Sequence, residues 1–142
     1  ARSGGSAVGV GPAVRLAASS TVTYYAYMVF GGDTTWLVEI TAGGENVLDL
    51  GSAVSANTNY TLRLEVDGST LRGYLNGVLD VEATDASLAA GGPGIAAYGG
   101  NDANTYVTTW TASDLSAAAA AAAMPSAFGR ELHARGHANL RR

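Results

Sequence analysis

Apolar and polar residues alternate in short runs along the first 115 residues, and glycine-rich turns separate these runs. Alternation with a period of two is typical of β-strands that bury one face. One such run places Trp36, Val38 and Ile40 on a single face. Apart from residues 60–81, strands are expected at residues 7–18, 21–30, 34–42, 47–51, 94–98 and 104–115. In the first of these, the pair Gly11-Pro12 predicts an edge position or a bulge.

Residues 60–81 contain two turn signals. Asp67-Gly68 and Asn76-Gly77 each lie between segments in which apolar and polar residues alternate. Both dipeptides favour tight hairpin turns, because Asn, Asp and Gly tolerate positive φ angles. The stretch therefore predicts a three-stranded antiparallel meander.

The register of this meander is open in its third strand. A two-residue turn at the first signal places Leu64 opposite Leu71 on the apolar face. The second turn then places Leu79 and Val81 on the other face. Either a bulge near the second turn shifts the register by one residue, or that face is covered too and is lined by Tyr74, Leu79 and Val81.

The number and spacing of the strands indicate the fold class. Seven to nine short strands, about ten residues apart, predict an all-β antiparallel sandwich or jelly roll. The composition agrees, since 47% of the residues are hydrophobic, 14% are charged and 19 are glycine. We expect one domain over residues 1–115, followed by an alanine-rich linker and a basic tail over residues 116–142.

Charge divides the chain into an acidic body and a basic tail. Residues 1–123 hold four Arg and eleven acidic residues, a net charge of −7, whereas residues 124–142 hold four Arg and one Glu, a net charge of +3. The acidic body argues against nucleic acid as its ligand, because phosphates require a positive surface. The absence of cysteine excludes disulfides and thiol chemistry, and no apolar run is long enough to span a bilayer.

The tail has few apolar residues and follows seven alanines, which cannot hold a helix alone. Phe128 and Leu132 are four residues apart, as on one face of a short amphipathic helix. We expect this tail to become ordered by packing on a partner or a neighbouring subunit. The residues expected to dock are Met124, Phe128, Arg130, Leu132, Arg135, Leu140, Arg141 and Arg142.

A family resemblance rests on the meander. Residues 60–68 follow the pattern Y-x-L-x-[apolar]-x-[apolar]-x-G, and residues 71–77 follow L-x-x-Y-[apolar]-[ND]-G. With Asp85 and the glycine-rich residues 91–95, this stretch resembles the C-terminal half of concanavalin A-like, laminin G-like jelly rolls. The resemblance covers about residues 7–115 and implies a sandwich fold whose closing YVTTWTASDL is the last strand. The resemblance also implies that the opening strands of such a domain are missing, and a sandwich without them is expected to expose a sheet edge that favours assembly.

The superfamily includes laminarinase-type hydrolases with a strand motif E-x-D-x-x-E. Glu65 and Asp67 match its first two positions, but Thr70 replaces the second glutamate, and the turn explains Asp67. His133 and His137 are the only histidines, and no serine lies in a G-x-S-x-G elbow, so no nucleophilic triad is expected. We expect neither catalytic residues nor enzymatic activity.

Oxygen-rich loops and aromatic residues leave two kinds of binding site open. The calcium candidates, which are equally typical of plain Asx turns, are Asp33, Asn101, Asp102 and Asn104. The glycan candidates are Trp110, Tyr98, Tyr106, Asn101, Asp102 and Asn104, with Trp36, Tyr24, Tyr25 and Tyr27 as further aromatic candidates. Aromatic residues at strand spacing are also typical of a core, so a fully buried Trp110 would exclude the sugar site.

Two functions remain. The first is a non-enzymatic structural or attachment component of a larger assembly, expected in a phage virion as a decoration, spike or tail protein. Its partners would be other subunits, in a homo-oligomer or among capsid and tail proteins. The alternative is a lectin-like, carbohydrate-binding adhesion module of an extracellular bacterial protein, with cell-surface glycans as partners. The expected location is a virion surface or the extracellular space.

Overall fold

The computed structural model describes residues 8–30, 34–99 and 107–115 of the chain. Its strands are β1 (Gly9–Ala18), β2 (Val22–Phe30), β3 (Thr34–Thr41), β4 (Gly44–Ala53), β5 (Leu62–Asp67), β6 (Thr70–Leu75), β7 (Val78–Thr84) and β8 (Gly92–Tyr98). Most lie where the alternating pattern predicts them. β4 is longer than expected, because its pairing with β3 continues to the turn at Gly44.

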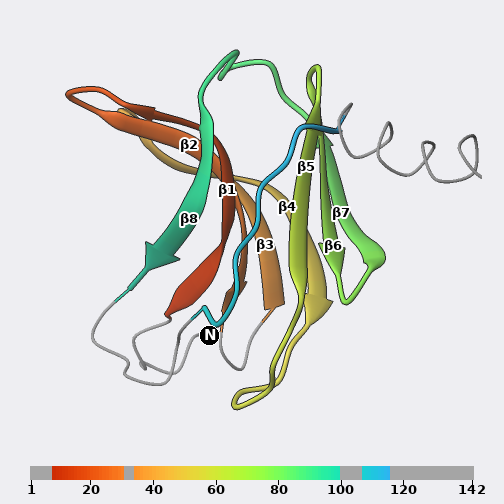
Figure 1. The fold of residues 1–142 in the computed structure, drawn as a ribbon. Helices are drawn as coiled ribbons and strands as arrows, with labels where there is room; N and C mark the ends of the chain where they lie inside the picture. The colour runs from red at the N-terminus through yellow and green to blue at the C-terminus, as the bar shows by residue number, and fades with distance from the viewer. Residues whose placement is uncertain (1–7, 31–33, 100–106, 116–142) are drawn as a thin grey trace, which may run out of the picture. The chain divides into compact units, whose positions relative to one another are not determined.

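The strands form two antiparallel sheets that pack face to face (Figure 1). The larger sheet has the order β4-β3-β2-β1-β8, and the smaller sheet has the order β5-β6-β7. The predicted fold class, an all-β antiparallel sandwich, is confirmed. The chain divides into two units, Ala1–Trp110 and Thr111–Arg142, and both sheets belong to the first. Within the described ranges, no helix has the length and apolar character needed to cross a membrane.

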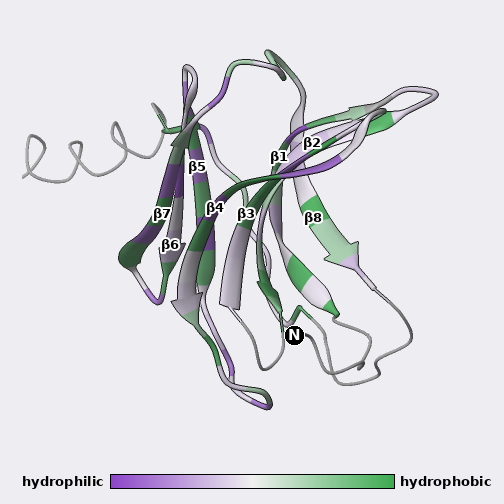
Figure 2. Ribbon diagram, turned by 180° about the vertical axis from the view of Figure 1, so that it is seen from behind, coloured by the Kyte–Doolittle hydropathy of each residue, from purple (hydrophilic) through white to green (hydrophobic). Residues whose placement is uncertain are grey.

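The core between the sheets follows from the alternation along the strands, which is visible as colour changes in Figure 2. Tyr25, Tyr27 and Leu37 of the larger sheet belong to one buried cluster with Leu71 and Val81 of the smaller sheet. None of these five side chains is more than 2% exposed. Burial of such large apolar side chains is the main force that holds the two sheets together.

The first hairpin turn differs from the prediction by one residue. The turn residues are Gly68 and Ser69, and Gly68 adopts a left-handed φ of 57° that costs glycine little. Leu71 therefore pairs with Val66, whereas its predicted partner was Leu64. The two residues are two positions apart on β5, so every side chain still lies on its predicted face of the sheet.

The second hairpin uses the predicted turn and then a bulge. Leu79 and Val81 of β7 lie opposite the adjacent Tyr74 and Gly73 of β6, which leaves Asp80 as the extra residue. Val81 is 2% exposed and packs in the core, whereas Leu79 is 50% exposed. Of the two alternatives for this strand, the bulge is confirmed. The other alternative, a covered second face lined by Tyr74, Leu79 and Val81, is wrong because Val81 faces the core.

β1 lies between β2 and β8, so the predicted edge position is wrong. Pro12 removes one backbone donor, and the neighbouring residues still pair on both sides. The strand does contain a bulge, but around Arg15, whose φ is 51°. The Arg15 guanidinium donates to the carbonyl of Leu88 (2.6 Å) and to that of Gly68, which ties β1 to two loops of the other layer.

Asp80 links the two sheets through a polar cluster. The bulge directs its carboxylate towards the larger sheet, where it accepts hydrogen bonds from the hydroxyls of Tyr27 (2.7 Å) and Thr35. It also accepts from the backbone N–H (2.9 Å) and the hydroxyl (2.5 Å) of Ser52. Burial raises the pKa of Asp80, but hydrogen bonds from Ser52, Thr35 and Tyr27 outweigh burial and hold the pKa below its ordinary value.

The last predicted strand is not present in its described part. Residues 107–115 contain no strand. Their apolar residues Val107, Trp110 and Leu115 are each more than 40% exposed, so this segment has no apolar face that a sheet would bury. Residues 104–106 and all predicted docking residues, from Met124 to Arg142, lie outside the described residues, and docking of the tail stays a prediction.

Candidate functional site

The two outer surfaces of the sandwich differ in chemistry. Because Leu37 of β3 faces the smaller sheet, its neighbours Trp36 and Val38 face outward. The register carries this outward face across the larger sheet to Tyr24 and Phe30 of β2. We call the outward side chains Tyr24, Phe30, Trp36, Ile40, Val47, Leu50 and Tyr98 the outer aromatic face.

Three rings of the outer aromatic face form a row. The ring centroids of Phe30 and Trp36 are 4.9 Å apart at 44°, and those of Phe30 and Tyr98 are 6.1 Å apart in an edge arrangement at 64°. Such tilted and edge contacts are the favoured geometries of aromatic pairs. The row crosses from β3 through β2 to β8. β2 and β3 follow each other in the sequence, whereas β8 comes much later in the chain.

Small residues beneath the rings make this row possible. Ala13, Ala26 and Ala96 are no more than 5% exposed and belong to the same cluster as Phe30. A Cβ atom at Gly9 would lie 2.7 Å from the Phe30 ring, so only glycine fits beside it in this arrangement. The rings are therefore held in fixed positions by the sheet under them.

Part of the outer aromatic face is open to solvent. Leu50 is 58% exposed, Tyr98 is 50% exposed and Val47 is 40% exposed. Exposed apolar surface of this kind marks a binding surface more often than isolated apolar residues do. Glu45 is the one charged side chain among the described strand positions of this face. Burial and the nearby Glu45 carboxylate raise the pKa of Tyr24.

The outer surface of the smaller sheet is charged instead. The Arg63 guanidinium lies 3.9 Å from the centroid of the Tyr74 ring and 2.9 Å from a carboxylate oxygen of Glu65. The Tyr74 hydroxyl donates to the other oxygen of Glu65 (3.1 Å), and Arg72 pairs with Glu82 at 2.6 Å. In this surface, positive and negative groups largely satisfy one another.

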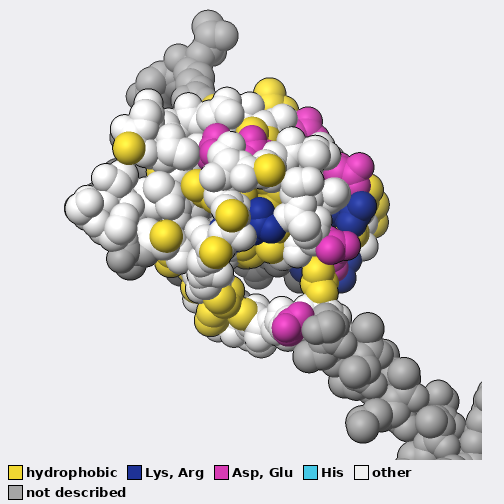
Figure 3. All heavy atoms as spheres, turned by 90° about the horizontal axis from the view of Figure 1, so that it is seen from above, with side chains coloured by type: hydrophobic (Ala, Val, Ile, Leu, Met, Phe, Trp, Pro, Cys, Tyr) yellow, Lys and Arg dark blue, Asp and Glu magenta, His cyan; other side chains and the backbone are white. Residues whose placement is uncertain are grey.

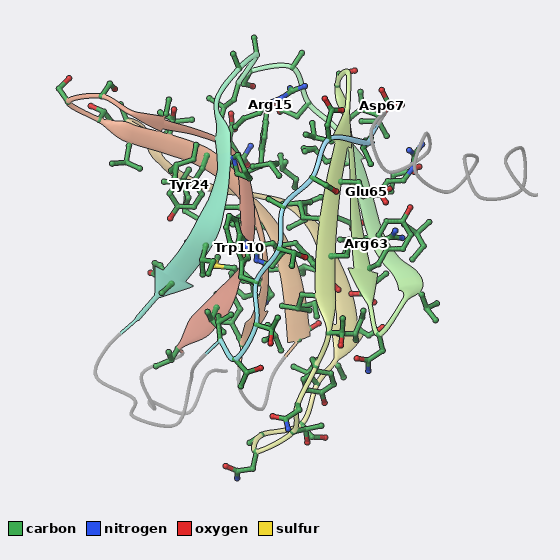
Figure 4. The ribbon with its side chains drawn as sticks, viewed as in Figure 1. Arg15, Tyr24, Arg63, Glu65, Asp67 and Trp110 are labelled. Atoms are coloured by element: carbon green, nitrogen blue, oxygen red, sulfur yellow. The ribbon has the colours of Figure 1, made fainter. Side chains whose placement is uncertain are left out.

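The pictures agree with this division. In Figure 4, Arg63 and Glu65 lie to the right of β5, whereas Tyr24 lies at the left, on the side of the larger sheet. Seen from above, acidic and basic side chains lie in the middle and at the right of the view, and the far left shows none (Figure 3). The larger sheet therefore offers an aromatic surface whose one charged side chain among the described strand positions is Glu45, and the smaller sheet offers a paired-charge surface.

Of the six main glycan candidates, the described part of the chain contains Tyr98 and Trp110. The further aromatic candidates are all described: Tyr24 and Trp36 lie on the outer aromatic face, whereas Tyr25 and Tyr27 are 0% exposed in the core between the sheets, so their prediction as sugar-binding residues is wrong. Tyr98 is in the aromatic row, and Trp110 is 45% exposed, so the burial that would exclude a sugar site is not found. The described ring contact of Tyr98 is with Phe30 and not with Trp110. Tyr106, Asn101, Asp102 and Asn104 lie outside the described residues, so the predicted loop site stays a prediction.

All four calcium candidates, Asp33, Asn101, Asp102 and Asn104, lie outside the described residues, so calcium binding stays a prediction. Over the described ranges, no three His, Cys, Asp or Glu side chains gather where a metal ion would bind. Glu65, from the E-x-D pair, contacts Arg63 and Tyr74, while Asp67 is exposed at the end of its strand.

Sequence reasoning missed three members of the outer aromatic face and the role of Asp80. Phe30, Val47 and Leu50 were not singled out, although Phe30 has the same strand parity as Tyr24. The available signal was the run of residues 24–30, which is apolar or aromatic at both parities and so predicts a strand buried on two faces. Asp80 was not singled out, because nothing in its sequence neighbourhood marks a contact with the other sheet.

Comparison with known proteins gives one informative match. The chain is similar to the solved structure of the carbohydrate binding module CBM66 from Bacillus subtilis, with a TM-score of 0.57 and 20% sequence identity. The match covers 65% of this chain and 58% of that structure, so this chain spans little more than half the length of the protein it matches. No protein-family model and no curated protein matches the chain.

At this level of identity, the likeness establishes the fold. The matched module and this chain share a β-sandwich fold, which supports the sandwich fold expected from the sequence. The match gives no support to a phage virion protein. What the matched protein binds belongs to that protein, and for this chain it is a matter of proposal.

Proposed function

We propose that this chain is a non-catalytic carbohydrate-binding module and that the outer aromatic face is its binding surface. The observation that carries the proposal is the row of Tyr98, Phe30 and Trp36, because the Tyr98 end is half exposed and the rest of the row holds it in place. The likeness to a carbohydrate-binding module supports the same conclusion.

The chemistry of sugars fits this surface. A sugar ring has a face of C–H groups with a slight positive charge, and the face of an aromatic ring is negative. Stacking therefore combines burial of apolar area with an electrostatic attraction. Because the ring of Tyr98 already rests on Phe30, little side-chain freedom remains to be lost when a ligand binds.

An assembly role is the second candidate. Leu50 and Val47 are exposed on the same face as Tyr98, and exposed apolar residues of this kind also suit a protein partner. The proposed docking of residues 116–142 belongs to this second candidate. In either case, a module of this type is proposed to act outside the cell or at a surface.

The proposal is tested with three variants on an array of immobilised glycans. Tyr98→Ala removes the exposed ring and is expected to lower affinity about tenfold or more, the equivalent of 1.4 kcal/mol. Tyr98→Phe keeps the ring and is expected to bind within a few-fold of the parent protein. Tyr74→Ala, on the charged surface of the other sheet, is the matched control and is expected to bind normally. Parent protein that binds no glycan, or equal binding by Tyr98→Ala, contradicts the proposal.

A further inference from the structure

The outer aromatic face has few polar groups with which to recognise individual hydroxyls. Over the described strands of this face, the polar groups are the hydroxyls of Tyr24 and Tyr98, the indole N–H of Trp36, the hydroxyl of Thr34 and the Glu45 carboxylate. The Thr34 hydroxyl is already used, since it donates to the carbonyls of Gly51 and Ser52. Sites that select one small soluble sugar use several converging polar groups in a concave pocket instead.

This scarcity of polar groups determines what binds well. A soluble oligosaccharide carries hydrated hydroxyls, and pressing them onto an apolar face removes water without replacing the hydrogen bonds. In a packed polysaccharide, neighbouring chains already satisfy many of these hydroxyls, and the exposed surface is rich in C–H groups. The cost of desolvation is therefore lower for the packed polymer than for the same sugar in solution.

The charge on the outer aromatic face further restricts the class of polysaccharide that can bind. The only charged strand residue described on this face is the acidic Glu45, and residues 1–123 have a net charge of −7. The described arginines make other contacts: Arg15 binds loop carbonyls, and Arg63 and Arg72 pair with acids on the smaller sheet. Among the described residues of this surface, sulfated or uronic acid polymers would meet like charge and no cation.

The spacing of the exposed side chains on this face suits a polymer rather than a single sugar. Phe30, in the middle of the row, is 3% exposed, so a ligand contacts mainly Tyr98, Val47 and Leu50. Tyr98 lies on β8 and Leu50 lies on β4, the two edge strands of the five-stranded sheet. Because neighbouring strands are ~4.8 Å apart, a ligand that contacts both edges must be longer than one sugar ring.

Resting on the proposed function, we infer that the outer aromatic face takes uncharged polysaccharide in its packed, insoluble form, by contact with C–H-rich chain surfaces. Soluble oligosaccharides of the same sugars bind far more weakly. The structure thus assigns a class of ligand and a physical state of that ligand to this face, and leaves the identity of the sugar to experiment.

The test uses the full chain in a depletion assay with insoluble cellulose, chitin and β-1,3-glucan. Binding to at least one is expected, retained in 1 M NaCl, with about a tenfold loss for Tyr98→Ala and no loss for Tyr74→Ala. Calorimetry with soluble oligosaccharides of the sugar that binds is expected to show at least about tenfold weaker affinity.

The outcomes separate the two proposals. Equal affinity for soluble and insoluble forms overturns the inference about the packed polymer and leaves carbohydrate binding standing. Salt-sensitive binding to sulfated or uronic acid polymers overturns the inference about charge. Failure to bind any polymer, together with a dimer in solution that Tyr98→Ala dissociates, assigns the face to a second copy of the chain and overturns both proposals.

Discussion

Replacing Asp80 by alanine removes one carboxylate that accepts hydrogen bonds from three strands of the opposite sheet. The donors are the hydroxyls of Tyr27 on β2 and Thr35 on β3, and the backbone and hydroxyl of Ser52 on β4. Asp80 itself is the extra residue of the β7 bulge. The substitution therefore tests whether this cluster, and not apolar packing alone, fixes how the two sheets meet.

The magnitude follows from the donors that are left behind. The Thr35 side chain is fully buried and the Tyr27 ring is 0% exposed, so neither hydroxyl has ready access to water once the carboxylate is gone. Each buried donor without a partner costs about 1–3 kcal/mol. Ser52 is exposed and is re-solvated at little cost. We expect Asp80→Ala to lower the free energy of unfolding by about 3–5 kcal/mol, a large share of the ~5–15 kcal/mol of a typical domain.

Urea unfolding at pH 7, followed by far-UV circular dichroism, measures this loss. Asp67→Asn is the matched control, because Asp67 is exposed at the end of β5, and a change within about 0.5 kcal/mol is expected. If Asp80→Ala does not fold, Tyr27→Phe removes one hydroxyl from the cluster and is expected to cost about 1 kcal/mol. A loss for Asp80→Ala no larger than that for Asp67→Asn refutes the reasoning.

The same cluster predicts a pH dependence. The pKa of Asp80 is held below its ordinary value in the folded protein, so the unfolded chain binds the proton more readily. The contribution of Asp80 is present above the unfolded pKa, near 4, and is lost as the pH falls through the folded pKa. Asp80→Asn should therefore unfold with less pH dependence in this acid range than the parent protein. An unchanged acid slope would contradict the assignment.

Three further substitutions test local features of the sandwich. Gly73→Ala places a Cβ 2.5 Å from Val81 and 2.7 Å from the Tyr27 ring, and we expect urea unfolding to show a loss of about 1–3 kcal/mol; a neutral result would mean that the sheets separate easily here. Gly77→Ala puts a side chain at a φ of 85° and should cost about 1–2 kcal/mol in the same assay, unless the hairpin adopts another turn. Glu39 is 7% exposed, and one of its carboxylate oxygens has no partner among the described residues. Glu39→Gln should therefore raise the urea midpoint of unfolding by an amount equivalent to about 1 kcal/mol. A lower urea midpoint would show that the charge of Glu39 is stabilising.

The sequence predicts those parts of the fold that depend on neighbouring residues. The Asn76-Gly77 turn is found as predicted, because both residues adopt the positive φ angles that favour this pair. The first turn lies one residue later, since the single glycine of Asp67-Gly68 takes the first turn position. The awkward register of Leu79 and Val81 was the visible sign of a bulge, but the position of the bulge depends on contacts with another sheet.

Features that depend on distant residues were predicted less well. The central position of β1 follows from pairing with β8, which lies about 80 residues later in the chain, and a Gly-Pro pair gives no sign of such a partner. The aromatic row has the same origin. Tyr98 was named from its residue type, but its contact with Phe30 depends on β8 lying next to β1. The charge pattern that leaves Glu45 as the one charged strand residue described on the outer aromatic face follows from the register and the bulges together.

Hydroxyl-radical footprinting of the protein bound to an insoluble neutral polysaccharide locates the binding surface directly. The label oxidises exposed aromatic side chains, and the protein carries an internal control, because Tyr98 and Tyr74 lie on opposite outer faces. Binding is expected to protect Tyr98 and Trp36 from oxidation and to leave Tyr74 unchanged. Protection of Tyr74 with continued oxidation of Tyr98 would contradict this expectation, because the charged sheet would then be the binding surface.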